Sequence, residues 1–268
     1  MVGRDVDDLY PRSSRTPGEL ILEIRGLAGR EKPAAATLAL ARGEVVGIAG
    51  LVGAGRTEMV RAIFGLDEVV AGAVRIGQHP GPASPAARWR QRAGMVSEDR
   101  KNEGLALGLS VADNITLPCL HRLGPGRLVR PSKQADAARR WIERLPIRCL
   151  DARQPVASLS GGNQQKVALA RLLHAGVDVL LLDEPTRGID VGSKAEIYRL
   201  IDDLARGDPG SGRPPKAVLI VSSYLPELLG ICDRIAVMCR GRLTDARPVA
   251  DWNQHQLMLA ATGQEPDA

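Results

Sequence analysis

Two stretches of the chain combine residue types that could hold a phosphate group and a metal ion. The first, Leu159–Gln165, contains two adjacent glycines and opens a helical pattern. Unpaired backbone N–H groups at the start of a helix, together with the helix dipole, attract anions. The second is the apolar run Val177–Leu182, which is followed at once by Asp183 and Glu184. A buried strand of this kind places its carboxylates at the sheet edge where open α/β proteins bind their ligands.

A glycine-rich loop earlier in the chain has the composition of a phosphate-binding loop. Gly50–Thr57 follows an apolar segment and precedes a helical pattern, which is the context that a P-loop requires. The pattern departs at Arg56, where a P-loop has a lysine, and a wide planar guanidinium does not replace a compact ammonium neutrally. A glycine-rich turn without a ligand is the alternative interpretation. The residues expected to bind nucleotide phosphates here are Gly50, Gly53, Ala54, Gly55, Arg56 and Thr57.

The carboxylates after the apolar run predict the chemistry of nucleotide hydrolysis. We expect Thr57 and Asp183 to hold Mg²⁺, with Asp183 acting through water, and Glu184 to orient or deprotonate the water that attacks the γ-phosphate. Two carboxylates that merely cap a strand end are the alternative. That alternative is hard to sustain when a P-loop belongs to the same sheet.

Three further polar residues follow expected strands. Glu98 is placed to sense a metal or γ-phosphate, or else belongs to a solvated acidic turn. Asp190 either bridges to a partner subunit or caps the next helix. Ser223 is expected to face the γ-phosphate as a catalytic hydrogen-bonding group, although a hydroxyl cannot become cationic as a histidine can.

Composition limits the possible classes of protein. The 268 residues are 44% hydrophobic and 25% charged, carry a formal charge of +5, and are only 3% aromatic. The scarcity of aromatic side chains argues against stacking on single-stranded nucleic acid, so no nucleic-acid partner is expected. The four cysteines show no metal-ligand spacing and are expected to be buried free thiols. Without an apolar stretch long enough to cross a bilayer, any membrane role is expected to come through a partner.

The hydrophobic pattern predicts an alternation of strands and helices with a helical region near the middle. Residues 1–18 are expected to form a linker or arm, 77–85 a loop, and the tail after 251 a short helix with a disordered end. The first strand is expected at a sheet edge. Strands are expected at 19–25, 38–41, 45–49, 74–76, 94–97, 177–182, 217–221, 235–238 and 242–244, and helices at 56–64, 111–117, 133–145, 162–174, 193–205 and 226–230.

These motifs together resemble an ABC-transporter ATP-binding domain over about residues 20–245. The P-loop, Leu159–Gln165, Asp183–Glu184 and Asp190 occur in the order and spacing of that family. The resemblance implies an α/β fold of ABC ATPase type, with a P-loop NTPase (RecA-like) core, an antiparallel β subdomain and an inserted helical subdomain. The implied domain spans 19–250, with its helical subdomain at about 100–155 and a C-terminal tail at 251–268.

A narrower resemblance is to the second cassette of the tandem ATP-binding proteins of ribose/galactose/xylose-type sugar importers. It is carried by Arg56 in the P-loop, Ser97–Arg100 where a glutamine loop is usual, Asp183–Gly192, and Ser222–Ser223 where a histidine is usual. Residues 1–12 also resemble the end of a first cassette and its linker. The chain therefore looks like the C-terminal half of a two-cassette protein.

In that family two cassettes close head to tail around ATP. The resemblance implies an ATPase that uses ATP and Mg²⁺, with a partner cassette, transmembrane permease subunits and, indirectly, a sugar-binding protein as partners. It implies a peripheral location at the cytoplasmic face of the membrane and a chain whose own site is of reduced activity. A non-catalytic nucleotide-sensing or interaction module is the alternative function. The signature residues implied to complete the partner's ATP site are Ser160, Gly161, Gly162 and Gln164.

Overall fold

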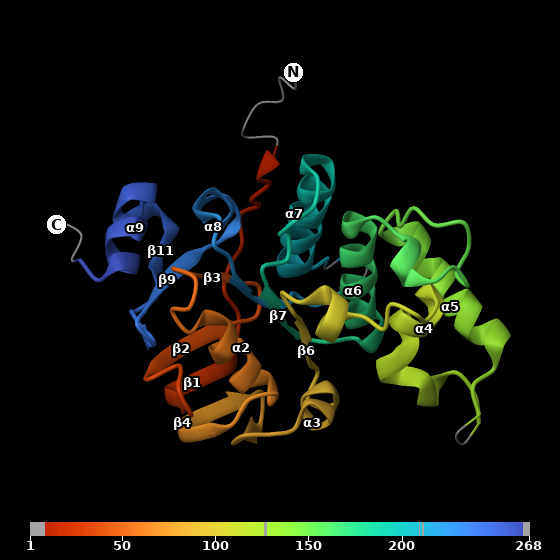
Figure 1. Cartoon of the computed structure of the whole chain (residues 1–268), viewed down its shortest axis with the longest axis horizontal. Helices are drawn as coiled ribbons and strands as arrows, with labels where there is room; N and C mark the ends of the chain where they lie inside the picture. Colours follow the sequence, from red (N-terminus) through yellow and green to blue (C-terminus); the bar gives the residue numbers. More distant parts are fainter. Residues whose placement is uncertain (1–8, 126–127, 209, 211, 265–268) are drawn as a thin grey trace. The chain divides into compact units, whose positions relative to one another are not determined.

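The computed structural model describes residues 9–125, 128–208, 210 and 212–264, which form two compact units (Figure 1). The first unit contains the described residues up to Met95, Asp178–Pro185, and those from Tyr198 onward; the second contains Val96–Val177 and Thr186–Ile197. The start of the expected arm, 1–8, and the end of the expected tail, 265–268, lie outside the described residues.

The strands described in the first unit form two sheets. In the smaller sheet neighbouring strands are antiparallel, in the order β2 (Ala36–Ala41), β1 (Leu20–Gly29), β4 (Val69–Ile76) and β5 (His79–Pro80). In the larger sheet β3 is parallel to β8 and β9, and β8 is parallel to β7. Its order is β10 (Arg242–Leu243), β9 (Arg234–Cys239), β3 (Val45–Gly50), β8 (Ala217–Val221), β7 (Val179–Asp183) and β6 (Ala93–Val96), and β11 (Arg247–Pro248) pairs with β9.

The edge position expected for the first strand is wrong. Leu22 in β1 pairs with Leu40 on one side and with Ile76 on the other, so the strand lies inside the smaller sheet. An antiparallel sheet that buries only one face gives its inner strands the same alternation of apolar and polar residues as its edge strands. The alternation in β1 therefore could not reveal its position.

The prediction of a loop at 77–85 is also wrong in part, because this segment contains β5 and the start of α3 (Pro85–Arg90). Ser84 caps this helix by accepting a hydrogen bond from the backbone N–H of Ala87, and Pro85 occupies its first turn. Proline is tolerated there because the first N–H groups of a helix have no partner within the helix. The fully buried Arg88 fastens α3 to α2 (Arg56–Phe64) by donating to the Ile63 carbonyl at 2.9 Å.

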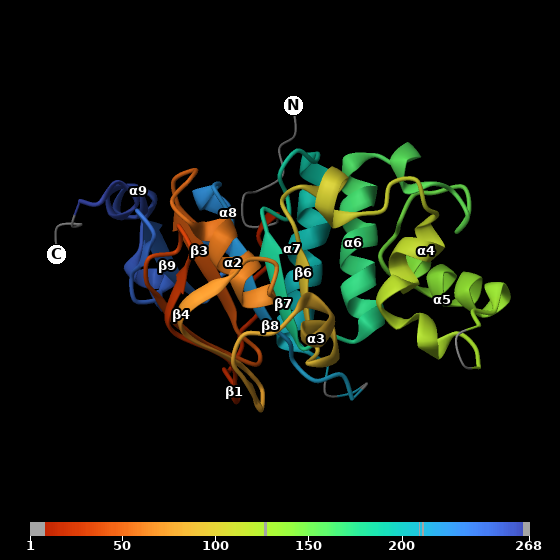
Figure 2. The same ribbon diagram turned by 60° about the horizontal axis from the view of Figure 1, so that its bottom comes forward.

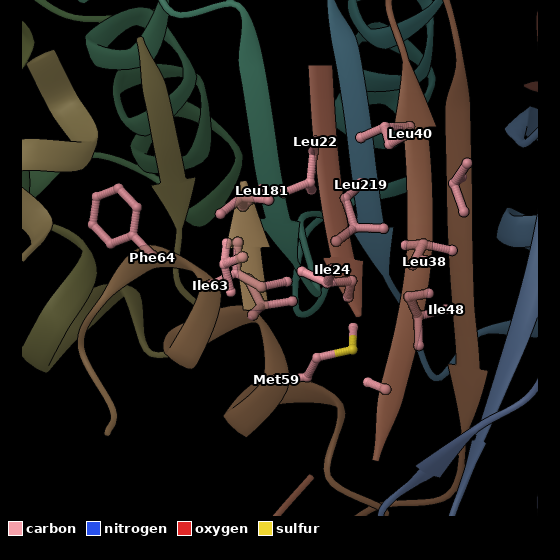
Figure 3. Close-up of a cluster of buried hydrophobic side chains, with 14 of the residues drawn as sticks. Leu22, Ile24, Leu38, Leu40, Ile48, Met59, Ile63, Phe64, Leu181 and Leu219 are labelled. Atoms are coloured by element: carbon pink, nitrogen blue, oxygen red, sulfur yellow. The ribbon is translucent and has the colours of Figure 1, made fainter. Parts of the chain in front are cut away.

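A core of aliphatic side chains joins the two sheets of the first unit to α2. Figure 3 shows Met59 and Ile63 of α2 directed toward Leu22 and Ile24 of β1 and Leu181 of β7. These five side chains are fully buried. The burial of apolar side chains is the main stabilising contribution to a domain. Here it also fixes the start of α2 relative to the ends of the strands. The helices α8 (Leu225–Ile231) and α9 (Gln254–Thr262) lie against β3, and α9 also contacts β9 (Figure 1).

The second unit is helical, as the pattern predicts. In it α4 (Val111–Thr116) packs against both α5 (Pro131–Arg144) and α6 (Gly161–Ala175), as Figure 2 shows. Short π and 3₁₀ helices, η1 (Arg100–Gly104) and η2 (Leu117–Arg122), flank α4, and η3 (Val156–Ser158) precedes α6. The helix α7 (Val191–Arg206) begins in this unit and ends in the first.

The described part of the predicted arm is fastened to the first unit. Ser13 donates to Asp202 through its backbone N–H at 2.9 Å and through its hydroxyl at 2.5 Å. The Arg15 side chain, only 2% exposed, forms ion pairs with Asp202 at 3.0 Å and Asp233 at 2.9 Å. The Tyr10 ring packs against the ring of Tyr198 with centroids 5.2 Å apart. These contacts hold the segment against the end of α7 and the start of β9.

We predict that Arg15→Ala lowers the free energy of unfolding by about 2–4 kcal/mol, because it leaves the buried Asp202 carboxylate without its cation. Urea unfolding followed by circular dichroism measures the change. The matched control is Arg12→Ala, whose side chain is 41% exposed and lies 3.7 Å from Asp233; it should cost less than about 1 kcal/mol. Equal losses for the two variants would contradict the structural role of Arg15.

Candidate functional site

The P-loop residues form a strand–loop–helix turn that presents backbone N–H groups. The loop leaves β3 at Gly50 and enters α2 at Arg56. Gly53 and Gly55 have φ angles of 76° and 110°, a region that residues with a side chain rarely adopt. Successive N–H groups in such a turn, with a helix N-terminus behind them, form an anion-binding concavity.

The guanidinium of Arg56 lies inside the protein, at the ends of β7 and β8. Arg56 is 7% exposed. Its Nη1 donates to the Ser222 carbonyl at 2.8 Å, and its Nη2 lies 3.6 Å from Oε1 of Glu184. The positive charge of the P-loop is thus balanced within the first unit by a carbonyl and a carboxylate. The sequence pattern identified the substitution of lysine by arginine but not these partners.

Glu184 is held from two directions. Its backbone has a φ of 47°, which is unusual for a residue other than glycine, and its N–H donates to the Val221 carbonyl at 2.9 Å. Its Oε1 accepts a hydrogen bond from the backbone N–H of Ser223 at 2.7 Å, on the same oxygen that faces Arg56. Backbone strain of this kind persists only where the surrounding structure fixes it, and it concentrates at functional sites.

Ser223 contacts Glu184 through its backbone, and its hydroxyl makes no hydrogen bond to the described residues. The neighbouring Ser222 is fully buried, and its hydroxyl donates to Oε2 of Glu227 at 2.5 Å. The same Ser222 oxygen accepts from the backbone N–H of Tyr224 at 3.0 Å. The serine pair therefore fixes the end of β8 and leaves only the second hydroxyl for a ligand.

Asp183 is fully buried, and within the described chain neither of its carboxylate oxygens has a donor in hydrogen-bond geometry. Burial raises the pKa of Asp183 to about 6; the nearby Thr57 hydroxyl opposes the rise and Glu184 adds to it. Buried polar atoms are almost always satisfied, so two unsatisfied oxygens call for a ligand. Carboxylate and hydroxyl oxygens suit Mg²⁺, which is bound through a few protein ligands and substrate phosphates.

No group of three or more His, Cys, Asp or Glu side chains suited to a metal ion occurs in the described ranges. An ion at Thr57 and Asp183 would therefore need ligands from a bound molecule or from water. The four cysteines are free thiols, as expected, but only Cys119 and Cys232 are buried; Cys149 and Cys239 are half-buried.

The expected signature residues lie in the second unit, where they begin α6. Ser160 is the N-cap residue, and its hydroxyl accepts from Nδ2 of Asn163 at 2.9 Å. Gln164 is directed inward, where its side chain donates to the Val156 and Leu159 carbonyls, both at 3.2 Å. Its amide therefore supports the turn before α6.

Close packing explains the second glycine of the signature. A Cβ on Gly162 would overlap the hydroxyl of Ser193 and come within 3.4 Å of Asp190. The start of α6 thus approaches the start of α7 at a distance that only glycine permits.

Asp190 caps α7. Its carboxylate accepts from the backbone N–H of Ser193 at 2.9 Å and from the Ser193 hydroxyl at 2.7 Å. These hydrogen bonds, with the backbone N–H first, lower the pKa of Asp190. Of the two roles left open by the sequence, the structure displays the cap. Glu98, also in the second unit, pairs with Arg187.

Arg100 braces the signature, a role that sequence reasoning missed. Its Nη1 donates to the Gly161 carbonyl at 3.1 Å and to Gln165 at 3.3 Å, and its Nη2 donates to the Arg187 carbonyl at 3.1 Å. One side chain thus fastens the first turn of α6 to the segment before α7. The motif containing Arg100 was visible in the sequence, but its partners lie about sixty to ninety residues away.

A polar pocket of about 230 Å³ lies within the second unit beside Ser160. Lys166, which is largely buried, pairs there with Glu196 and donates to the Pro146 carbonyl at 3.0 Å. The remaining lining residues are Arg148, Asn163, Asp190, Gly192 and Ser193. The expected functional residues thus form two clusters: Gly50–Thr57, Asp183, Glu184 and Ser223 in the first unit, and Glu98, Ser160–Gln164 and Asp190 in the second.

Comparison with known proteins shows the family to which the chain belongs. The ABC transporter family model matches residues 34–187. The chain is 44% identical over 268 residues to the ribose import ATP-binding protein RbsA 1 of Rubrobacter xylanophilus, covering 99% of this chain and 52% of that protein. It is also 44% identical over 268 residues to a ribose/galactose/methyl galactoside import ATP-binding protein of Burkholderia cenocepacia, covering 99% and 51%.

The fold also matches solved structures of ATP-binding cassettes. A dimeric cassette in a post-hydrolysis state superposes with a TM-score of 0.71 at 22% identity, covering 85% of this chain and 99% of that chain. A nucleotide-free cassette from an ABC transporter has a TM-score of 0.68 at 18% identity, covering 86% and 92%.

The fold and the two clusters define an ABC-type P-loop cassette, and the chain belongs to the ABC transporter family. It spans about half the length of the curated relatives it matches. None of the described helices is both long and apolar enough to cross a membrane.

The stability of the protein should depend on the protonation of the buried Asp183 carboxylate. Because the folded-state pKa of Asp183 is raised, the protonated form adds stability below about pH 4, and this contribution is lost as the pH rises through 6. In metal-free buffer at pH 7.5, Asp183→Asn should therefore raise the free energy of unfolding by about 1–3 kcal/mol, and by much less at pH 4.5.

Thermal unfolding in EDTA at the two pH values measures this difference. The control is Asp251→Asn, an exposed carboxylate, which should leave stability unchanged at both. A destabilised Asp183→Asn protein at pH 7.5 would show that the carboxylate is satisfied within the apoprotein.

Proposed function

We propose that this chain is an ATP-binding subunit of an ABC importer for monosaccharides, corresponding to the second cassette, and that it couples ATP binding and hydrolysis to transport. The observation that carries the proposal is the braced signature turn at Ser160 in a chain that matches ribose import ATP-binding proteins along its whole length. Relatives named for ribose and for ribose/galactose import support the monosaccharide class.

In the first unit, the P-loop N–H groups would bind the ATP phosphates, and Thr57 and Asp183 would hold Mg²⁺. The bound metal ion would neutralise phosphate charge. Glu184 would orient the attacking water, and the Ser223 hydroxyl would hydrogen-bond the γ-phosphate. The unsatisfied Asp183 oxygens support this assignment.

The contacts of Glu184 favour a reduced activity for this chain's own site. One of its two carboxylate oxygens, Oε1, already faces both the Arg56 guanidinium and the Ser223 N–H. A general base must have its oxygen within hydrogen-bond reach of the water. Hydrolysis here would therefore have to use the second oxygen, Oε2, or exchange the partners of Oε1, and the nearby Arg56 charge would lower the basicity of the carboxylate in either case. ATP binding has no such requirement.

The second unit would serve a different ATP molecule. We infer that Ser160, Gly161 and Gly162, supported by Gln164, complete a site on the P-loop of a partner cassette in a head-to-tail dimer. Glu98 and Asp190 would face that interface. Asp190 already caps α7, so it would reach the partner only as part of an ordered turn.

The further partners are proposed from the same relationship. Transmembrane permease subunits would contact the helical unit, and a sugar-binding protein would act through the permease. The chain would lie at the cytoplasmic face of the membrane, held there by the permease, without a nucleic-acid partner. The alternative of a non-catalytic sensing module is not favoured, because the named relatives are import ATP-binding proteins.

The proposal predicts unequal effects of two substitutions on ATP turnover in a mixture. The mixture contains this chain and the half of the Rubrobacter RbsA 1 protein that the chain does not match. Ser160→Arg, which places a bulky cation at the signature, should lower turnover about tenfold or more through loss of transition-state contacts. Glu184→Gln, which alters this chain's own site, should change turnover less than about twofold.

Circular dichroism of each variant controls for folding. A mixture that loses activity with Glu184→Gln but keeps it with Ser160→Arg would contradict the proposed division between the two units.

A further inference from the structure

Lys32 lies across the P-loop of the first unit. Its Nζ donates a hydrogen bond to the Gly53 carbonyl. Its aliphatic stem covers Gly55, where an added Cβ would lie 3.2 Å from Cβ and 3.5 Å from Cδ of Lys32. A Cβ on Gly241 would lie 3.7 Å from Cγ of the same side chain. The lysine is therefore confined between two glycines, with its ammonium group at the loop that would bind phosphate.

Backbone hydrogen bonds hold the segment that carries Lys32 at this place. The Ala34 N–H donates to the Gly241 carbonyl at 2.7 Å, and the Gly241 N–H donates to the Ala54 carbonyl at 2.8 Å. The Ala35 N–H also donates to the Gly241 carbonyl, at 3.1 Å. Residue 241 thus connects the lysine segment to the P-loop, so the position of Lys32 is built into the fold.

The charges around the loop indicate a role for this ammonium group. Arg56, which replaces the usual P-loop lysine, directs its guanidinium to Ser222 and Glu184. Lys32 pairs with no carboxylate in the part of the chain that the structure describes, and only one of its three donors has a protein acceptor there. Its neighbour Arg30, in contrast, pairs with Glu68 at 2.7 Å.

We propose that Lys32 is a phosphate-binding residue of the P-loop site, where it supplies a nucleoside di- or triphosphate with the cationic contact that Arg56 makes inside the protein. The inference rests on the proposed function, because it requires that the P-loop binds nucleotide.

The bound state requires only a change of acceptor. Nζ is attached through flexible single bonds, so rotation of the outer side chain can move it from the Gly53 carbonyl to a phosphate oxygen while the stem stays on Gly55. The Gly53 carbonyl is a neutral acceptor, whereas a phosphate oxygen carries negative charge and adds direct Coulomb attraction to the ammonium. The nucleotide would therefore compete effectively with the carbonyl for Nζ.

The test is equilibrium binding of a fluorescent N-methylanthraniloyl derivative of ATP, with Mg²⁺, to the full chain and to variants of Lys32. Lys32→Gln retains a hydrogen-bond donor but loses the charge, and Lys32→Arg retains both. Lys32→Gln should weaken binding about tenfold or more and reduce its salt dependence, whereas Lys32→Arg should stay within about threefold of the wild type. Inorganic tripolyphosphate should displace the probe from the wild type more effectively than from Lys32→Gln.

The matched control is Arg30→Gln, which removes a neighbouring cation that is already paired and should leave affinity unchanged. Unaltered affinity in Lys32→Gln, with normal binding by the wild type, would overturn the role of Lys32 and leave the proposed function intact. Equal losses in Lys32→Gln and Lys32→Arg would assign the residue a structural role and also overturn the inference. A wild-type chain that binds no nucleotide would overturn both the inference and an active P-loop site.

Discussion

The first unit of the cassette depends on one buried interaction, that of the Arg56 guanidinium with the Ser222 carbonyl and the Glu184 carboxylate. It joins the first turn of α2 to the ends of β7 and β8, where the expected catalytic groups lie. A buried charge is tolerated only when it is paired and hydrogen-bonded, so these three residues constrain one another. The same contact that organises the site also engages one oxygen of the carboxylate that hydrolysis would require.

In the second unit, contacts within the protein support the signature turn on several sides. Arg100 fastens the Gly161 carbonyl, Asn163 orients Ser160, and Ser193 packs where a Cβ on Gly162 would lie. A surface whose shape is fixed before binding loses less conformational entropy when a partner arrives. Under the proposed function, this preorganisation would favour completing a partner's site over hydrolysis at the chain's own.

The sequence predicted those features that depend on short segments. The P-loop, the apolar strand ending in Asp183, and the helix beginning after Ser160 each follow from neighbouring residues, and the structure has these elements at the expected places. The family and the fold were likewise predicted from the order of these motifs, and the comparisons confirm both. Local glycine and apolar patterns suffice for such features because the backbone conformation is decided within a few residues.

Features that depend on distant contacts were not predictable in this way. The inner position of β1 is decided by its pairing with both β2 and β4, and the short helix α3 depends on Arg88 reaching α2. The partners of Arg56 follow it by more than a hundred residues in the sequence. Lys32 and Gly53, which are in contact, are separated in the sequence by the two strands β2 and β3. A residue type indicates what a side chain can do, but only the folded chain decides which groups it meets.

The most direct measurement of the central claim is steady-state ATP hydrolysis by the isolated chain, followed by the same assay with a partner cassette added. We expect no turnover above background for the chain alone and clear turnover for the mixture, since this chain's intact signature would then complete the partner's P-loop site. Robust turnover by the isolated chain, abolished by Glu184→Gln, would contradict the account. It would show that the contact of Glu184 with Arg56 does not prevent hydrolysis and that the chain is a self-sufficient ATPase.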